Sequence, residues 1–451
     1  MKKKVTPKIM SGFMELLPAQ QLAFERMKKI VQDTYESYGF VPLDTPVLEL
    51  SEVLLAKAGG ETEKQIYRFT KGDTDMCMRF DLTVPFSRFV AKNQNDLAFP
   101  FRRYCIGKVY RGERPQKGRF REFYQADIDI IGNEKLSTVY DAEIPSIMYG
   151  VLTKLGLKRF HIRMNNRKLL HGFYQSLGLE EQSADILRLV DKIDKIGPEN
   201  VRLGLLDLGV SQQNANHILS FVQIGGNTET VMTQLSELGI DNEAFNTGQE
   251  ELKTVSDALT VLGVPQTHYQ IDLKITRGLD YYTGTVYETT VDDYPTWGTI
   301  CAGGRYDNLA ENYTDKKLPG IGMSIGLTRL FDLLNSAGLI HCEGQSPTEV
   351  LVLPMGEGVA YPLTVAKKLR DAGIKTEVYF ADVKFKNKMT YANKIGVPYV
   401  VILGEDEQAN QTVSFKNMTT GEQENVSLDD VANRLKTLLV DCPEISVITQ
   451  E

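Results

Sequence analysis

Residues 101–131 read FRRYCIGKVYRGERPQKGRFREFYQADIDII, and this stretch decides the fold that the sequence predicts. Alternating apolar and polar residues at 103–111 and 120–131 predict two strands, and the polar segment 112–119 predicts the turn between them. Side chains alternate between the faces of a strand, so one face of the second strand carries Arg121, Phe123, Gln125, Asp127 and Asp129. An acidic face is costly to bury, and we therefore expect it to line a polar cleft.

The same stretch is strongly basic within an acidic chain. The 451 residues carry a formal net charge of −8, whereas residues 101–121 hold eight lysines and arginines and one acid, Glu113. Such a local excess of positive charge suits a phosphate-rich ligand. The alternative is a solvated basic face, but the run alternates with Phe, Tyr, Ile and Val, which a purely solvated segment does not need.

Outward from this hairpin, the sequence predicts a helix at 18–38 and an extended segment at 40–48, where two prolines exclude helix. Residues 150–265 are helix-rich and lack strong chemical motifs, and strand-like alternation returns at Ile271. A boundary falls near 343–347. Beyond it, strands at 350–353, 375–380 and 399–403 alternate with helices near 359–372 and 386–395, which predicts a small, mainly parallel α/β domain.

Composition restricts the class of protein. A chain of this length is expected to form two or three domains. The basic start has no apolar region behind it, which argues against a signal peptide, and no apolar run approaches the ~18 residues of a membrane span. The five cysteines are scattered, which favours a reducing, cytoplasmic location over a disulfide scaffold. Neither these cysteines nor the five histidines have metal-ligand spacing, so the sequence predicts no protein-built metal site.

Four motifs carry a resemblance to a known family. They are RFDLT at 79–83, RGERPQKGRFREFYQ at 111–125 running on to Asp129, RGLDYYTG at 277–284, and AGGRYD at 302–307 paired with GIGMSIGLTRL at 320–330. In this order they resemble the histidyl-tRNA synthetases, which are class II aminoacyl-tRNA synthetases, over essentially the whole chain.

The resemblance implies a fold and an assembly. It implies an α+β catalytic domain at 1–335, with a mainly antiparallel sheet flanked by helices and a helical insertion at about 165–265. It further implies an α/β anticodon-binding domain at 346–451. The family is homodimeric, and the segment around Pro46 resembles the motif at its dimer interface.

The resemblance also implies an activity, namely ATP-dependent activation of L-histidine and its transfer to the 3′ end of tRNA(His). Arg111 and Arg277 would hold the α-phosphate, since arginine offers a planar fork of donors to phosphate oxygens. Mg²⁺ would accompany the ATP phosphates. The remaining implied contacts are Asp81, Thr83, Gln125, Asp129, Tyr281 and Tyr282 with histidine, Glu113, Phe120 and Arg329 with ATP, and Arg114, Gln116 and Lys117 with tRNA.

Some positions depart from the commonest family forms. Asp81 and Asp129 stand where many bacterial members carry glutamate, and Thr328 replaces the glutamate usual before the motif arginine. Three alternatives stay open: a regulatory paralogue that acts on histidine biosynthesis, a sensor of uncharged tRNA, and a synthetase for another amino acid such as threonine or proline. Retention of the ATP-binding arginines and of a C-terminal domain argues against the regulatory paralogue. The lack of a fused signalling domain argues against the sensor. The motif RGLDYYTG together with Asp129 argues against a synthetase for another amino acid.

Overall fold

The computed structural model describes residues 4–56, 60–276, 281–340, 342, 344–356 and 358–440. They divide into two compact units, the larger built mainly on residues 28–339 and the smaller on residues from 340 onward, with residues 15–27 grouped with the smaller. None of the described helices combines the length and apolar character needed to span a membrane.

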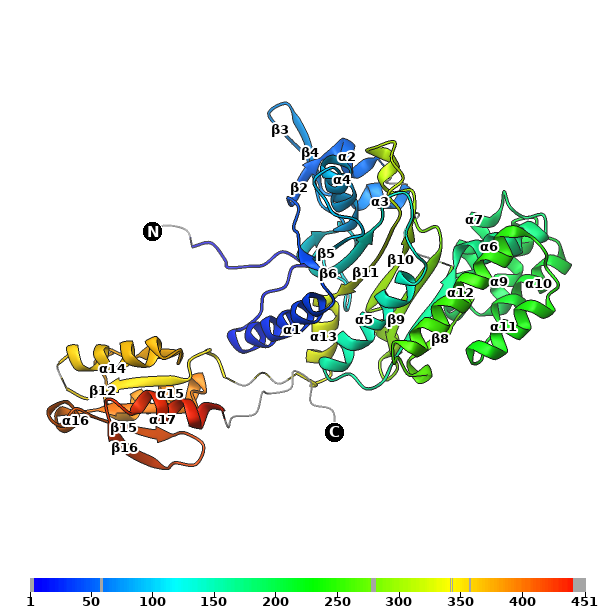
Figure 1. Ribbon diagram of the computed structural model, residues 1–451. Coiled ribbons are helices and arrows are strands. Elements are labelled where there is room, and N and C mark those ends of the chain that lie inside the picture. The colour runs from blue at the N-terminus through cyan, green and yellow to red at the C-terminus, as the bar shows by residue number, and fades with distance from the viewer. Residues whose placement is uncertain are drawn as a thin grey trace. The chain divides into compact units, whose positions relative to one another are not determined.

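An eight-stranded sheet forms the centre of the larger unit (Figure 1). The predicted hairpin is confirmed, because β5 (Phe101–Tyr110) and β6 (Glu122–Ile131) pair antiparallel from Phe101↔Ile131 to Tyr110↔Glu122. The strand order is β1-β5-β6-β11-β10-β9-β7-β8, and β1 and β8 at its edges pair parallel to their neighbours while the inner pairs are antiparallel. The other strands are β1 (Val41–Pro42), β7 (Phe160–Asn166), β8 (Tyr269–Ile271), β9 (Thr285–Val291), β10 (Cys301–Tyr306) and β11 (Gly320–Gly326).

On the other face of β6, Ala126, Ile128 and Ile130 are completely buried. Helix α5 (Tyr140–Lys154) packs on β11, and α13 (Leu327–Ser336) packs on β6 and β11. Helix α1 (Pro18–Ser37) reaches β6 through the Tyr35 hydroxyl, which donates to the Ala126 carbonyl at 3.1 Å. Burial of this apolar face leaves the acidic face of β6 for a pocket.

A module of helices gathers at one end of the sheet, beyond β9 and β8 (Figure 1). Helices α6 (Arg167–Ser176) and α12 (Glu243–Val261) pack closely because two glycines face the contact. A Cβ on Gly172 would lie 2.3 Å from the Phe245 nitrogen, and one on Gly248 would lie 2.3 Å from the Leu169 nitrogen. Between them lie α7 (Ser183–Val190), α8 (Ile193–Ile196), α9 (Pro198–Asp207), α10 (Gln212–Val222) and α11 (Thr228–Glu237).

A second, three-stranded sheet precedes the RFDLT segment along the chain. Its order is β2-β4-β3, formed by β2 (Leu48–Leu50), β3 (Arg68–Lys71) and β4 (Thr74–Met78). Helices α2 (Ser51–Leu55), α3 (Gly60–Gln65) and α4 (Thr83–Asn93) accompany it. The predicted extended segment at 40–48 is therefore divided between the edges of two sheets.

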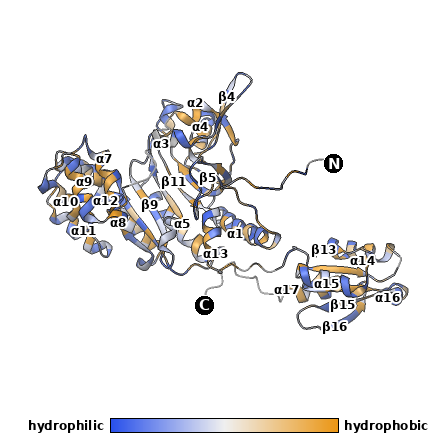
Figure 2. Ribbon diagram, turned by 180° about the vertical axis from the view of Figure 1, so that it is seen from behind, coloured by the Kyte–Doolittle hydropathy of each residue, from blue (hydrophilic) through white to orange (hydrophobic). Residues whose placement is uncertain are grey.

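The smaller unit contains a five-stranded sheet in the order β13-β12-β14-β15-β16. The predicted parallel part is confirmed in β12 (Val350–Pro354), β13 (Thr376–Val378) and β14 (Tyr399–Leu403), with α14 (Ala360–Asp371) and α15 (Phe385–Ile395) as its helices. Figure 2 shows hydrophobic strands at the centre of this unit. The structure adds α16 (Glu405–Asn410), α17 (Val431–Val440) and the antiparallel hairpin β15 (Thr412–Asn417) and β16 (Gln423–Ser427). These elements were not predicted, although Val413 and Phe415 alternate with polar residues.

Candidate active site

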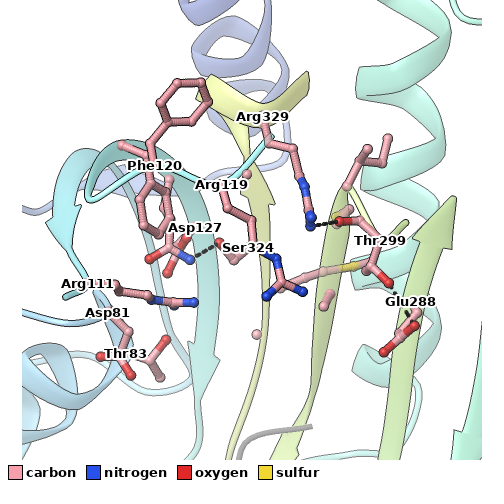
Figure 3. A pocket seen from close by; sticks show the side chains of 18 of the residues that line it. Asp81, Thr83, Arg111, Arg119, Phe120, Asp127, Glu288, Thr299, Ser324 and Arg329 are labelled. Carbon is pink, nitrogen blue, oxygen red and sulfur yellow. Dashed lines mark hydrogen bonds between the residues drawn. The ribbon is translucent and has the colours of Figure 1, made fainter. Parts of the chain in front are cut away.

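A cavity of about 440 Å³ lies over the acidic face of β6 and the adjoining strands β11 and β10 (Figure 3). Figure 3 shows Asp81, Thr83 and Arg111 on one side, Arg329, Thr299 and Glu288 on the other, and Asp127 and Ser324 between them. The cavity brings together most of the predicted site residues, namely Asp81, Thr83, Arg111, Glu113, Phe120, Gln125, Asp129, Tyr281, Tyr282 and Arg329.

The glycines of β10 and β11 make room for the side chains of this site. Asp129 pairs with Gly322 on β11, which in turn pairs with Gly304 on β10. A Cβ on Gly322 would lie 2.2 Å from the Asp129 Oδ1, and one on Gly304 would lie 2.9 Å from the Tyr282 ring. No side chain larger than hydrogen fits there without displacing a pocket residue.

Asp129 is held by groups of the protein itself. Its Oδ1 accepts a hydrogen bond of 2.6 Å from the Tyr306 hydroxyl, and its Oδ2 lies 2.8 Å from the Arg103 guanidinium. Burial raises the pKa of this carboxyl, while the Arg103 charge and the Tyr306 hydrogen bond oppose the increase. Asp129 therefore lies in the pocket as predicted, with both oxygens already in contact with protein groups.

Asp81, Thr83 and Arg111 form one wall. Asp81 lies two residues before the start of α4 and accepts a 3.0 Å hydrogen bond from the Val84 amide. Burial raises the pKa of the Asp81 carboxyl. Arg111 lies over the rings of Phe80 and Phe123, at 4.3 and 5.2 Å from their centroids, and donates to the Phe80 carbonyl at 3.2 Å. Burial lowers the pKa of this guanidinium, and these contacts fix its plane for an incoming anion.

The opposite wall carries Arg329 in the first turn of α13. Its Nη1 donates to the Thr299 carbonyl at 2.7 Å, and the Thr299 hydroxyl donates to Glu288 at 2.8 Å. An arginine at a helix N-terminus provides favourable surroundings for phosphate oxygens. The neighbouring Thr328 is buried and accepts a 2.8 Å hydrogen bond from the Tyr124 amide, so it supports β6 and does not face the pocket.

The turn between β5 and β6 is held at its tip. The Arg119 amide donates to the Gln116 carbonyl at 2.8 Å, and Gly118 takes the left-handed conformation with φ of 68°. The Lys117 ammonium lies 4.6 Å from the centre of the Trp297 ring, and a Cβ on Gly118 would lie 2.9 Å from the same ring. Arg114, Gln116 and Lys117 are exposed and lie outside the cavity.

The interpretation of the whole basic run as a phosphate site was wrong for several of its members. Arg103 is buried beneath Asp129, Arg102 pairs with Glu143 at 2.9 Å, and Lys108 pairs with Glu122 at 2.8 Å. Alternation along β5 places Arg103 on the opposite face of the strand from Arg102 and Lys108. Arg111, Arg119 and the basic residues of the turn are still candidates to bind anions.

Several pocket residues did not emerge as site residues from the sequence: Gln65, Arg119, Asp127, Glu288, Thr299, Cys301, Tyr306 and Ser324. Asp127 was placed with Gln125 and Asp129 on the strand face expected to line a cleft, but it was given no binding role. Glu288 and Thr299 reach the cavity only through the pairing of distant strands. Arg277, the second predicted phosphate ligand, lies outside the described residues.

Metal ligands do not cluster in the described part of the chain: it contains no group of three histidine, cysteine, aspartate or glutamate side chains able to hold an ion. The cavity offers separate carboxylates. A Mg²⁺ ion typically keeps several waters and takes phosphate oxygens as further ligands, so these residues fit an ion that arrives with a nucleotide better than a resident one.

Comparison with known proteins gives consistent matches over most of the chain. The family profile "Histidyl-tRNA synthetase" matches residues 12–330, and the profile "Anticodon binding domain" matches residues 349–438. A histidine–tRNA ligase of Clostridium tetani is 53% identical, with 96% of this chain and 98% of the relative covered, and that of Clostridium acetobutylicum is 46% identical over 96% and 100%.

Solved structures agree with these matches. The crystal structure of histidyl-tRNA synthetase from Nostoc sp. PCC 7120 is 39% identical, covers 96% of this chain and 100% of its own, and superposes with a TM-score of 0.88. A Bacillus halodurans protein described as an ATP phosphoribosyltransferase regulatory subunit/histidyl-tRNA synthetase, at 20% identity and a TM-score of 0.75, shares the fold. With a class II sheet, an anticodon-binding domain and these relatives, the chain belongs to the histidyl-tRNA synthetase family.

Proposed function

We propose that this chain activates L-histidine with ATP to histidyl-adenylate and transfers the histidyl group to the 3′ end of tRNA(His), in the cytoplasm and as a homodimer. One observation carries the proposal. A single cavity places carboxylates suited to an amino acid beside arginines suited to phosphate, in a chain 53% identical over 433 residues to a histidine–tRNA ligase.

In the first step, a carboxylate oxygen of histidine attacks the α-phosphorus of ATP and pyrophosphate leaves. This reaction needs positioning and stabilisation of charge more than covalent participation by the protein. Arg111 binds the reacting carboxylate and α-phosphate from the Asp81 side, Arg329 meets the terminal phosphates, and Phe120 and Glu113 hold the adenine. Arg277, outside the described residues, is proposed as the second α-phosphate ligand.

Asp81, Thr83 and Gln125 are proposed to hold the ammonium group and backbone of histidine, with Asp129, Tyr281 and Tyr282 around its ring. The two tyrosine rings lie 5.0 Å apart and edge to face, and Tyr281 also contacts Tyr306 at 5.8 Å. Mg²⁺, bound by ATP phosphates and water, would supply further charge neutralisation.

In the second step, a hydroxyl of the terminal ribose of tRNA attacks the carbonyl carbon of the adenylate, and AMP leaves. We propose that residues 1–335 perform both steps, that the module at about 165–265 is an insertion into this catalytic domain, and that residues 346–451 bind the anticodon. The turn residues Arg114, Gln116 and Lys117 meet the acceptor end. Leu48, Leu50 and Phe69 expose apolar surface on the small sheet, which suits contact with a second copy.

Amino-acid-dependent exchange of pyrophosphate into ATP, measured over a panel of amino acids, tests the proposal. Histidine alone should support exchange, and Arg111→Ala should reduce it at least a hundredfold, or roughly 3 kcal/mol of transition-state stabilisation. Arg111→Lys should restore only part, because an ammonium lacks the guanidinium fork. A regulatory or tRNA-sensing protein would show no exchange with any amino acid.

A further inference from the structure

The turn between β5 and β6 contacts the rest of the larger unit at its tip, and the proposed function gives this contact no role. Gln116, Lys117 and Arg119 are exposed, but Gly118 among them is buried. A turn that was solvated on all sides would expose its glycine together with its neighbours. The burial of Gly118 therefore marks the point at which the turn packs on another element.

The ring of Trp297 provides most of the surface at this point. Trp297 ends the short 3-10 helix η2 (Pro295–Trp297), which follows β9, and it is 6% exposed. The Lys117 ammonium lies 4.6 Å from the centre of the ring, within the range of a cation–π contact. A Cβ on Gly118 would lie 2.9 Å from Cε3 and 3.1 Å from Cζ3 of the ring, so the close approach requires a glycine.

The same contact joins the turn to Arg329. A Cβ on Gly118 would lie 3.4 Å from the Arg329 Nε, and the Gly118 amide donates a hydrogen bond to Asp332, which is also on α13. Thr299, two residues after Trp297, accepts a 2.7 Å hydrogen bond from Arg329 through its carbonyl. Gly118 and Arg329 line the cavity, whereas Trp297 is not one of its lining residues. The tip of the turn, the segment around Trp297 and the start of α13 therefore pack together beside the cavity.

We infer that Trp297 is a positioning residue, which holds the tip of the turn beside Arg329 and so maintains the conformation of the turn that binds ATP. The inference rests on the proposed function, in which Glu113 and Phe120 hold the adenine and Arg329 meets the terminal phosphates. These contacts are made to the two ends of one nucleotide, so the turn and α13 must keep a fixed separation. Trp297 acts through Gly118 and contacts no substrate itself.

The physical effect of the ring is on the population of the binding conformation. An aromatic ring beneath an ammonium and a glycine favours one position of the turn, because it adds a cation–π contact and removes apolar surface from water. The apparent affinity for a ligand falls in proportion to the fraction of molecules in the binding conformation. Asp81 and Thr83, which are proposed to hold histidine, lie at the start of α4 and outside the turn. Release of the turn should therefore affect ATP and not histidine.

The test measures the KM values for ATP and histidine in pyrophosphate exchange, using the full-length wild type, Gly118→Ala and Trp297→Leu. The matched control is Gly421→Ala in the turn between β15 and β16. Gly118 and Gly421 are both left-handed, with φ of 68° and 79°, but a Cβ on Gly421 would have nothing within 4 Å. Gly118→Ala and Trp297→Leu should each raise the KM for ATP about fivefold to tenfold and change that for histidine less than about twofold. Gly421→Ala should change neither.

A double variant separates the contact from other effects of the two substitutions. Trp297→Leu removes the ring atoms that a methyl group at position 118 would meet. Gly118→Ala made in the Trp297→Leu background should therefore raise the KM for ATP no further than Gly421→Ala does in the wild type, because the two residues act through one contact. If Trp297→Leu does not fold, the comparison of Gly118→Ala with Gly421→Ala still decides the question.

A purely structural role for Trp297 has a different signature. It would lower the thermal midpoint and the fraction of active enzyme and leave both KM values unchanged. Equal KM values for ATP in Gly118→Ala and Gly421→Ala, equal increases for histidine and ATP, or additive effects in the double variant would each overturn the inference. Absence of histidine-dependent exchange in the wild type would instead refute the proposed function, and calorimetric titration of the same variants with ATP would then decide the role of Trp297.

Discussion

The arrangement of this site depends on the absence of a Cβ atom at Gly322. Gly322→Ala would place a Cβ 2.2 Å from the Asp129 Oδ1, so the carboxyl must move and its contacts with Tyr306 and Arg103 must weaken. We expect a loss of about 1–3 kcal/mol in the free energy of unfolding, as overpacking typically causes, together with an increased KM for histidine.

Chemical denaturation and exchange kinetics check this expectation. The matched control is Gly326→Ala on the same strand, where the nearest atom would lie at 3.5 Å, an ordinary contact. A similar loss of stability in both variants would show that the strand, and not Asp129, responds to the substitution.

Burial raises the pKa of Asp127 to about 7, which predicts a pH dependence of stability. The unfolded carboxyl releases its proton near 3.8 and the folded one near 7, so between these values the folded protein binds more protons than the unfolded chain. Its free energy of unfolding therefore falls as pH rises through this window, by at most about 4 kcal/mol, and the penalty is constant above it.

Asp127→Asn removes this contribution, although Arg103, Asp129 and Asp81 stay in place around the site. The stability difference between the variant and the wild type should grow from pH 4 to pH 7 and then level off in denaturation experiments on the ligand-free protein. A difference that is independent of pH would mean that Asp127 is already ionised throughout.

Single residues also mark the limit of prediction from the sequence. Strand alternation was sufficient to place Gln125, Asp127 and Asp129 on one polar face, because the period of a strand is fixed. It could not reveal that Arg103 forms an ion pair with Asp129, since that contact depends on the register between β5 and β6. A local pattern predicts which face of a strand a residue occupies, whereas the register between two strands determines which residue it contacts.

At the scale of elements, two helical glycines should respond oppositely to the same change. Gly150 lies inside α5 with nothing within 4 Å of the position that a Cβ would take, whereas a Cβ on Gly248 of α12 would lie 2.3 Å from the Leu169 nitrogen of α6. Gly150→Ala should stabilise the protein by about 0.5–1 kcal/mol through helix propensity.

Gly248→Ala should destabilise the protein by about 1–3 kcal/mol, because the two helix backbones must separate. Thermal unfolding of both variants gives the comparison. If Gly248→Ala also raised the midpoint, the close packing of α6 on α12 would not exist in solution.

The turn between β5 and β6 predicts a separation of two effects on tRNA. Gln116 offers an exposed amide to a base edge, and base contacts specify a partner whereas phosphate contacts position it. The family resemblance implies that this turn reads an extra guanosine on tRNA(His), so Gln116→Ala should reduce discrimination between tRNA(His) with and without that nucleotide, with little change in histidine activation.

Lys117→Ala should instead weaken all tRNAs alike and lower the salt dependence of binding by about one unit of slope. Aminoacylation of the two tRNA forms and binding at several salt concentrations measure these effects. An unchanged preference ratio in Gln116→Ala would support a basic turn without a base contact.

Elements with strong signals were predictable and those with weak signals were not. Helix α1 and the parallel strands β12 and β14 follow from apolar periodicity and continuous apolar runs. The hairpin β15–β16 was overlooked because its exposed second strand, QENVS, lacks a hydrophobic pattern. Its place in the sheet is set by pairing with β14 through β15, which is information that a short local window does not contain.

At the scale of the whole molecule, the two units should be separable by function. In the smaller unit, Phe380 and Phe385 are 50% and 40% exposed, and the lysines at 384 and 386 are exposed beside them. Aromatic rings and cations in one segment suit unpaired nucleotides, since bases stack on rings and phosphates meet lysines.

Phe380→Ala should raise the KM for tRNA about fivefold or more, because stacking contributes roughly 1–3 kcal/mol per base, and leave pyrophosphate exchange unchanged. Aminoacylation and exchange assays on the full chain separate the two effects. Val261→Ala, which truncates an 87% exposed side chain in the larger unit, is the control and should change neither reaction. Equal loss of both reactions in Phe380→Ala would show that the unit affects folding and not tRNA binding.

The contact between Lys117 and Trp297 gives the molecule a natural optical probe. Trp297 is the chain's sole tryptophan and is 6% exposed, and its ring lies under the Lys117 ammonium, so close to Gly118 that a Cβ there would lie 2.9 Å from it. Indole emission shifts with local polarity and is sensitive to a nearby cation. Every displacement of that turn, whether by a nucleotide entering the cavity or by an RNA end arriving at its mouth, therefore has a label-free fluorescence signal from one defined position.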